Sequence, residues 1–397
     1  SEPVLSITPS ANARAETDCV LFQPRTVCAV FFFRVLARLA PINSKPTIKT
    51  FIIMRTYRDN NYIYNNQMES ANIANPFVVG KYVAPQYFCD REQETALLAK
   101  HIDNGRNVAL ISPRRMGKTG IIHHAFSQGE IKEKYNLIFI DIYATSSLVE
   151  LTYMLAKAVY DNLKSRRKAW LERFSQVVRS LWMGFKIDAM SGEPTFDIGL
   201  GDISAPEETL DEILRYLEEA DRPCVVAIDE FQQIGNYPEK NVEALLRTKI
   251  QTCRNTQFIF AGSKRHVMGN MFLSSSKPFY QSAIIMGLGP IPEERYVGFA
   301  VRLFGMRGKS VDPDIVSRVY RRFDGCTWFV QMMMNELFAI IPEGGNCGHD
   351  EIDTAFDNVI QSQESAYTAI LARLSPRQKA LLQAIAKEGV ASSITSE

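Results

Sequence analysis

Long apolar runs are missing from this chain. No stretch of its 397 residues reaches the roughly 20 consecutive apolar residues that a helix needs to cross a bilayer. The nearest run, Val27 to Ala40, is too short and carries Arg34 and Arg38. A long polar stretch precedes this run, which is atypical of a secretory signal peptide. We therefore expect neither a membrane span nor a membrane partner.

Paired cysteines, metal-binding histidines and charge of one sign are missing as well. None of the seven cysteines forms a C-x-x-C pair, and the five histidines show no metal-ligand spacing. This usage is typical of reduced thiols and favours a cytoplasmic location over a disulfide framework. The formal net charge is only +1, with 22% charged residues. The chain as a whole therefore has no electrostatic preference for nucleic acid or for acidic substrates.

One glycine is missing from the motif around which the chain is organised. Residues 108–122 read VALISPRRMGKTGII, which predicts a short strand, a tight loop and a helix. The phosphate-loop pattern is G-x-x-x-x-G-K-[ST], and Ser112 occupies the position of its first glycine. Loop N–H groups and the positive end of the helix can still face a phosphate. The predicted nucleotide-binding residues are Ser112, Pro113, Arg114, Arg115, Met116, Gly117, Lys118, Thr119 and Gly120.

The polar residues of this loop have separate expected roles. Lys118 can reach the β- and γ-phosphates, and the Thr119 hydroxyl can ligate Mg²⁺. For Arg114 and Arg115 two readings stay open. They either act on negative charge, of the phosphates or of an acid on a neighbouring subunit, or they lie in a solvated turn. On the loop alone, a chance G-K-T between a strand and a helix remains an alternative.

A second stretch supports a nucleotide site. Residues 224–228 (CVVAI) form a continuous apolar run, typical of a buried parallel strand, and Asp229-Glu230 follows them. Ligands of open α/β sheets bind at the carboxyl ends of such strands. We expect Asp229 to hold Mg²⁺ and Glu230 to orient or deprotonate an attacking water. Taken alone, the acidic pair would be read as an N-cap or a solvated turn.

Residues 1–67 differ from the rest of the chain. Between Cys19 and Arg58 there are seven Lys or Arg and no acid. An organelle-type presequence, a disordered basic arm and upstream sequence that is not normally translated all fit this composition. We favour the last hypothesis, with Met68 as the natural start, because compact-domain patterning begins just after it.

The remaining sequence predicts an α/β core at 68–290 and a helical lid at 291–373. Strands expected in the core alternate with helices, which predicts a parallel sheet covered on both faces. A hairpin or loop insertion is expected at 185–203, and no strand after Pro290. The expected strands are 107–112, 136–143, 224–228, 257–263 and 283–286. The expected helices after the core are 293–304, 312–323, 327–337, 351–374 and 377–387, the last within a segment 374–397.

Four motifs together resemble the archaeal-type ATPase family, which belongs to the STAND branch of the AAA+ P-loop NTPases. The resemblance covers roughly Phe77 to the C-terminus, and the loop Pro-Arg-Arg-x-Gly-Lys-Thr is its most specific part. The motifs are Phe88…Asp90-Arg91-Glu92, Ser112 to Thr119, Ile228-Asp229-Glu230-Phe231-Gln232 and Phe260-Ala261-Gly262-Ser263.

This resemblance implies an ATPase core, a helical lid and a C-terminal winged helix-turn-helix, with ATP and Mg²⁺ as cofactors. It implies that Ser263 is a polar sensor of the γ-phosphate and that Arg91 lies near the nucleotide. The chain departs from the family at Ser112 and at Gly325-Cys326-Thr327, where relatives carry Gly-x-Pro. Only the first helix of a winged domain is found before Glu397, so DNA binding through a recognition helix is not expected.

The function expected from these features is that of a Mg²⁺-dependent ATPase acting as a molecular switch, with nucleotide held between sheet and lid. The catalytic set is Lys118, Glu230 and Ser263. The alternative is a nucleotide-gated regulatory or DNA-associated module with little turnover. No Asn-Lys-x-Asp motif is present, which favours adenine over guanine. A protein partner is expected without its identity, and homo-oligomerisation stays open.

Overall fold

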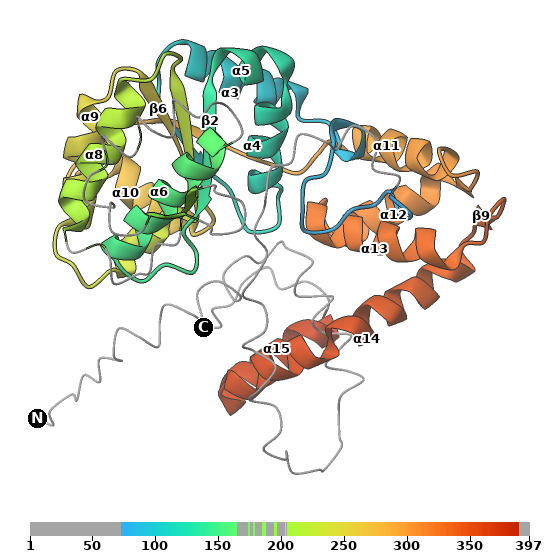
Figure 1. Cartoon of the computed structure of the whole chain (residues 1–397). Coiled ribbons are helices and arrows are strands. Elements are labelled where there is room, and N and C mark those ends of the chain that lie inside the picture. Colours follow the sequence, from blue (N-terminus) through green and yellow to red (C-terminus); the bar gives the residue numbers. More distant parts are fainter. Residues whose placement is uncertain are drawn as a thin grey trace, which may run out of the picture. The chain divides into compact units, whose positions relative to one another are not determined.

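The structure is a computed structural model that describes residues 73–164 and 205–388, together with 174, 178, 185–187, 194–196 and 203. The described residues form two compact units (Figure 1). An α/β unit contains residues 80–289, and a helical unit contains residues 73–79 and 290–388. The N-terminal extension expected at 1–67 lies outside the described residues.

The α/β unit is built on a five-stranded sheet of order β2-β5-β6-β1-β7, in which every pairing is parallel. Strands β5 and β6 are buried along their whole length, because both faces of the sheet are covered. The predicted parallel sheet is therefore confirmed. Its strands are β1 (Val108–Ile111), β2 (Asn136–Asp141), β5 (Cys224–Asp229), β6 (Thr256–Gly262) and β7 (Ile284–Gly287).

Two apolar layers cover the sheet, and strand alternation divides the core between them. Along β5, Val226 and Ile228 join one cluster, whereas Val225 and Ala227 join the other. The first cluster includes side chains of α6 (Leu148–Lys164), α8 (Pro206–Glu218), α9 (Val242–Thr252) and α10 (Arg265–Leu273). The second includes side chains of α3 (Glu92–Asp103), α4 (Lys118–Ser127) and α5 (Gly129–Lys134).

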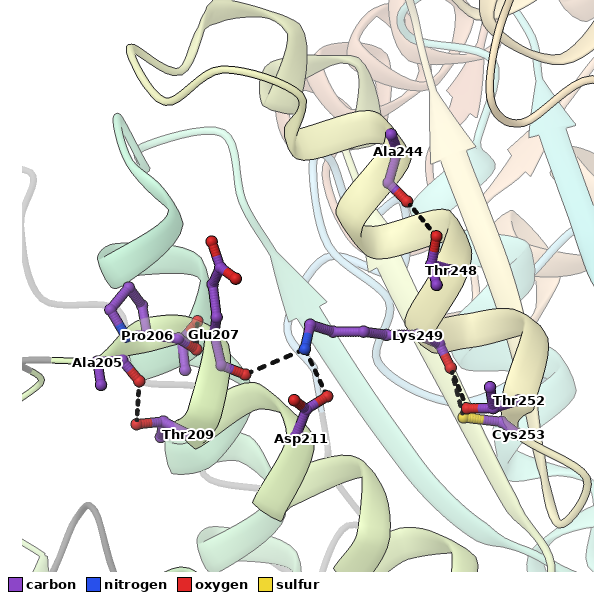
Figure 2. Close-up of polar contacts among 11 residues, drawn as sticks. Ala205, Pro206, Glu207, Thr209, Asp211, Ala244, Thr248, Lys249, Thr252 and Cys253 are labelled. Atoms are coloured by element: carbon purple, nitrogen blue, oxygen red, sulfur yellow. Dashed lines mark hydrogen bonds and ion pairs between the residues drawn. The ribbon is translucent and has the colours of Figure 1, made fainter.

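Helices α8 and α9 lie next to each other on one face of the sheet (Figure 2). The Lys249 amine of α9 lies 2.5 Å from a carboxylate oxygen of Asp211 and 3.3 Å from the carbonyl oxygen of Glu207, both on α8. The Lys249 side chain is 12% exposed and the Asp211 side chain 51%, so water screens this ion pair and its contribution to stability is small.

Helices α6 and α3 begin in different ways. Ser147 caps α6, because its hydroxyl accepts a hydrogen bond from the Glu150 N–H at 3.3 Å. The residue before α3 is Arg91, in a left-handed conformation with φ 76°, and no side chain caps the helix.

Two minor strand pairs complete the description. The predicted hairpin is present as β3 (Phe185–Ile187) and β4 (Pro194–Phe196), which pair antiparallel. The prediction that no strand follows Pro290 was wrong, because β8 (Ser310–Val311) and β9 (Asn346–Cys347) form a short parallel pair. Two residues are too few to produce a detectable alternation in sequence.

The helical unit contains the predicted helices and one unexpected segment. Residues 73–79, which the sequence analysis grouped with the core, pack against the helices instead. The Phe77 ring is fully buried, 5.3 Å from the Phe304 ring and 5.9 Å from the Phe338 ring. Asn75 and Asn335 each donate a side-chain hydrogen bond across this contact, both at 2.8 Å. The helices are α11 (Glu293–Gly305), α12 (Pro313–Arg322), α13 (Thr327–Ile340), α14 (Asp350–Arg373) and α15 (Pro376–Glu388).

Two sequence-based expectations can be compared with the described residues alone. None of the helices there is both long enough and apolar enough to span a bilayer. No disulfide is formed by the five cysteines in this part of the chain, which are Cys89, Cys224, Cys253, Cys326 and Cys347.

Candidate nucleotide-binding site

The predicted phosphate loop connects β1 to α4. Gly117 directly precedes α4 and has φ 91°, a left-handed value that favours glycine. Arg115 is also left-handed, with φ 69°, whereas Ser112 is not among the left-handed residues. Ser112 is 1% exposed, and its N–H lies 3.4 Å from the carbonyl oxygen of Gly262. Serine therefore replaces the first glycine of the pattern without left-handed strain.

Lys118, Thr119 and Asp229 converge where β5 ends and α4 begins. The Thr119 hydroxyl donates a hydrogen bond to the Asp229 carboxylate. Burial lowers the pKa of Lys118, and the nearby charges of Asp229 and Glu230 oppose this shift. Burial also raises the pKa of Asp229, against the effects of the Thr119 hydrogen bond and the Lys118 charge. Both ionic groups would gain from a further partner, an anion at the amine and a cation at the carboxylate.

Glu230 is held in place by two neighbouring side chains. It directly follows β5 and has a left-handed backbone, with φ 54°. Its Oε2 atom accepts a hydrogen bond from the Ser263 hydroxyl at 2.8 Å and another from the Gln232 side-chain amide. The Gln232 amide oxygen lies 3.3 Å from the backbone nitrogen of Ser263. The structure thus brings together the two predicted residues Glu230 and Ser263, which come from neighbouring strands.

Sequence reasoning missed the part played by Gln232. This side chain is only 5% exposed and makes hydrogen bonds to both Glu230 and Ser263. It belongs to the quoted motif after β5, but no role was assigned to it. An amide two residues after a carboxylate is a weak signal, because such residues are usual in turns.

Arg114 reaches from the phosphate loop to the end of β6. Its Nε atom donates to the Ser263 hydroxyl at 3.3 Å, and its guanidinium carbon lies 5.8 Å from the centre of the Tyr143 ring. Arg114 is nevertheless exposed, so both readings of this residue stay open. Arg115 is exposed.

Asp141 is a second residue that the sequence analysis left without a role. It ends β2, and in the sheet register it lies directly opposite Asp229. Partial burial raises the pKa of Asp141 to about 6, opposed by a hydrogen bond from the Tyr143 N–H and assisted by the charges of Asp229 and Glu230. A carboxylate that shares the strand ends with two others is therefore harder to ionise.

The Arg91 side chain contacts the backbone of the phosphate loop. Only 4% of this side chain is exposed, and it pairs with Glu94 at 2.6 Å. Its Nη2 atom donates to the carbonyl oxygens of Gly289 at 2.7 Å and Met116 at 3.4 Å. Gly120 faces the ring of Phe88, since a Cβ atom there would lie 3.0 Å from the ring.

The donor set suits Mg²⁺ bound together with phosphate. The Thr119 hydroxyl and the Asp229 carboxylate are hard oxygen ligands, which Mg²⁺ prefers. Within the described part of the chain, no group of three or more His, Cys, Asp or Glu side chains could hold a metal ion by itself. A metal here would need further oxygens from phosphate and water, which is the usual mode of Mg²⁺ in such sites.

Comparison with known proteins gives similarity of fold. No protein-family model and no curated protein matches the sequence. A Walker-type ATPase of Pyrococcus abyssi is similar in structure, with a TM-score of 0.56 and 19% identity over 78% of this chain and 83% of that one. The Aeropyrum pernix ORC2 protein, in ADPNP–ADP complexes, has a TM-score of 0.53 and 14% identity over 79% and 78%.

A third similar structure is the Aeropyrum pernix ORC1 protein in complex with DNA. It has a TM-score of 0.50 and 12% identity over 79% of this chain and 75% of that one. The chain shares its fold with these three proteins. At identities this low the similarity concerns architecture, so the chemistry of the site has to be argued from its own residues.

Proposed function

We propose that this protein binds ATP with Mg²⁺ and hydrolyses it, and that it acts as a nucleotide-driven switch. The observation that carries the proposal is the meeting of Lys118, Thr119, Asp229 and Glu230 at the carboxyl edge of a parallel sheet. Fold neighbours described as a Walker-type ATPase and as ADPNP–ADP complexes support the same choice of ligand.

The residues divide the task between charge and orientation. The buried Lys118 amine and the loop amides at Gly117 bind the β- and γ-phosphates, because an anion relieves the buried positive charge. Thr119 and Asp229 hold the metal, which neutralises phosphate charge when bound. Glu230 orients the attacking water and accepts its proton. To do so, its carboxylate must exchange the hydrogen bonds that it receives from Ser263 and Gln232 for a hydrogen bond from the attacking water.

The helical unit is the proposed lid, and we propose that its angle to the α/β unit carries the signal of the switch. We also propose that α15 is the first helix of a winged helix-turn-helix. Adenine is the proposed base, in line with the absent guanine-reading motif.

Steady-state ATP hydrolysis by the full chain tests the proposal. Lys118→Ala should weaken nucleotide binding and abolish turnover, because it removes the buried amine that lies near Asp229 and Glu230 at the start of α4. Glu230→Gln should keep binding and reduce kcat by about 100-fold or more, the usual contribution of a general base. Glu208→Gln, on the exposed side of α8, is the matched control. If Lys118→Ala hydrolysed ATP as fast as the parent, the proposal would fail.

A second function has one observation in its favour. Because Glu230 already accepts hydrogen bonds from Ser263 and Gln232, the protein could hold nucleotide with little turnover as a regulatory or DNA-associated module. Phosphate release should then be equally slow for wild type and Glu230→Gln. The comparison is made with and without duplex DNA, since one fold neighbour is described in complex with DNA.

A further inference from the structure

The start of α3 has an unusual backbone. Asp90 and Arg91 are consecutive left-handed residues, with φ 53° and 76°, and neither is glycine. Such conformations cost about 1–3 kcal/mol each and persist only where the surroundings enforce them. The Arg91 side chain that this backbone carries is buried although it is charged.

The guanidinium joins two segments that are far apart in sequence. Its Nη1 atom lies 2.6 Å from the Glu94 carboxylate, which neutralises the buried charge and fixes the side chain. Its Nη2 atom donates both to Met116, inside the phosphate loop, and to Gly289, the last residue of the α/β unit. The bond to Gly289 is short, at 2.7 Å, whereas the bond to Met116 is long, at 3.4 Å.

The bond to Met116 determines which way a loop amide points. Peptide bonds are planar and trans, so the carbonyl of Met116 and the N–H of Gly117 point in opposite directions. With the carbonyl turned towards Arg91, the N–H of Gly117 is turned away from it, as a phosphate-binding amide requires. A phosphate that accepts this N–H polarises the peptide and makes the Met116 oxygen a better acceptor.

We propose that Arg91 is a positioning residue that couples nucleotide at the phosphate loop to the segment 288–291. This segment leaves the sheet after β7 and leads into the helical unit. Bound nucleotide strengthens the hydrogen bond between Arg91 and Met116. This holds the guanidinium in place, so its hydrogen bond to Gly289 becomes firmer as well. By reciprocity, loosening the segment weakens nucleotide binding. This inference rests on the nucleotide site proposed above.

A purely structural Arg91 would behave differently. Its replacement would lower the stability of the unit by the same amount with and without nucleotide. Coupling instead predicts that the replacement removes a difference between the nucleotide-bound and nucleotide-free states. Hydrogen exchange measures that difference, because Leu288, Gly289 and Ile291 each carry a backbone N–H and Pro290 does not.

The experiment compares amide exchange in the full chain with and without MgADP and a non-hydrolysable ATP analogue. Arg91→Lys retains the charge opposite Glu94 but loses the planar fork that serves two carbonyls. Arg222→Lys is the control, since Arg222 also donates to two acceptors, Glu133 and Asn136, outside the phosphate loop. In wild type and in the control, nucleotide should slow exchange at 288–291 by about tenfold, a typical coupling. Arg91→Lys should lose this slowing and bind nucleotide about tenfold more weakly.

Two results would overturn the coupling and leave the proposed function intact. One is nucleotide binding by wild type without any change of exchange at 288–291. The other is an unchanged slowing in Arg91→Lys. If Arg91→Lys does not fold, Glu94→Gln replaces it, since it leaves the guanidinium but removes its anchor; an undiminished slowing there would overturn the coupling too. A wild type that binds no nucleotide would remove both the proposed function and this inference.

Discussion

Adding a single methyl group at Gly262 should have a large effect on the stability of the α/β unit. It ends β6, beside Ile111 of β1. A Cβ atom at Gly262 would lie 2.5 Å from the amide oxygen of Gln232 and 2.5 Å from both Cγ and Sδ of Met268. Non-bonded heavy atoms essentially never approach a Cβ atom this closely, so at least one neighbour must move. Met268 is fully buried, which leaves it little room.

The size of the effect follows from overpacking a close-packed interior. Added methyl groups cost about 1–3 kcal/mol when the neighbours cannot relax. For a domain of about 150–250 residues, each kcal/mol lowers Tm by about 2–4 °C. Gly262→Ala should therefore lower the Tm of the α/β unit by about 2–12 °C. If Gln232 is the neighbour that moves, Glu230 loses a hydrogen-bond donor, and kcat should change more than nucleotide affinity.

A double-mutant cycle separates overpacking from other causes. Met268→Ala alone should cost about 2–5 kcal/mol because it leaves a cavity. In that background, Gly262→Ala should cost less than in wild type, since only the overlap with Gln232 remains. Thermal unfolding by circular dichroism, with and without nucleotide, measures the four corners of the cycle.

The matched control is Gly235→Ala. Gly235 lies in the 3₁₀ segment after β5, has nothing within 4 Å of a Cβ position, and is not left-handed. This change should leave Tm unchanged or raise it slightly. If Gly262→Ala were as stable as Gly235→Ala, or equally costly with Met268 present and absent, the packing argument would be refuted.

Three further outcomes are expected. Thr119→Val removes the hydroxyl that donates to Asp229. The factor by which Mg²⁺ increases nucleotide affinity, measured by calorimetry, should therefore be about tenfold smaller than in wild type. Burial lowers the pKa of His123 to about 4, so below pH 6.5 the unfolded state binds more protons than the folded state. The free energy of unfolding should therefore fall by at most about 3 kcal/mol as the pH drops from 6.5 to 4. His123→Phe should flatten this part of the stability curve measured with denaturant, and parallel curves for the two proteins would contradict the shift. Gly325→Ala should destabilise the helical unit by about 1–3 kcal/mol in thermal unfolding, since φ is 64° and a Cβ atom would overlap the Tyr320 hydroxyl; an unchanged Tm would show that the residue can relax.

The prediction of the fold rested on features that act locally. The apolar residues within 224–228 and 257–263 are typical of interior strands, and the two strands β5 and β6 are fully buried neighbours in the sheet. The segment 73–79 shows where such reasoning stops. Phe77 is apolar and can be buried in either unit, and only its contacts with Phe304 and Phe338 assign it to the helical one.

The sequence by itself predicted the phosphate-loop residues, the two acids at the end of β5 and the parallel sheet that places them, because these predictions depend on residue type and short spacing. The tertiary structure alone decided how Glu230 is held by Gln232 and Ser263, that Arg114 turns to Ser263, and that Arg91 bridges Met116 and Gly289. Those contacts join residues up to 198 positions apart. Their partners are selected by distance and direction in the folded chain, and neither quantity is encoded in a local pattern.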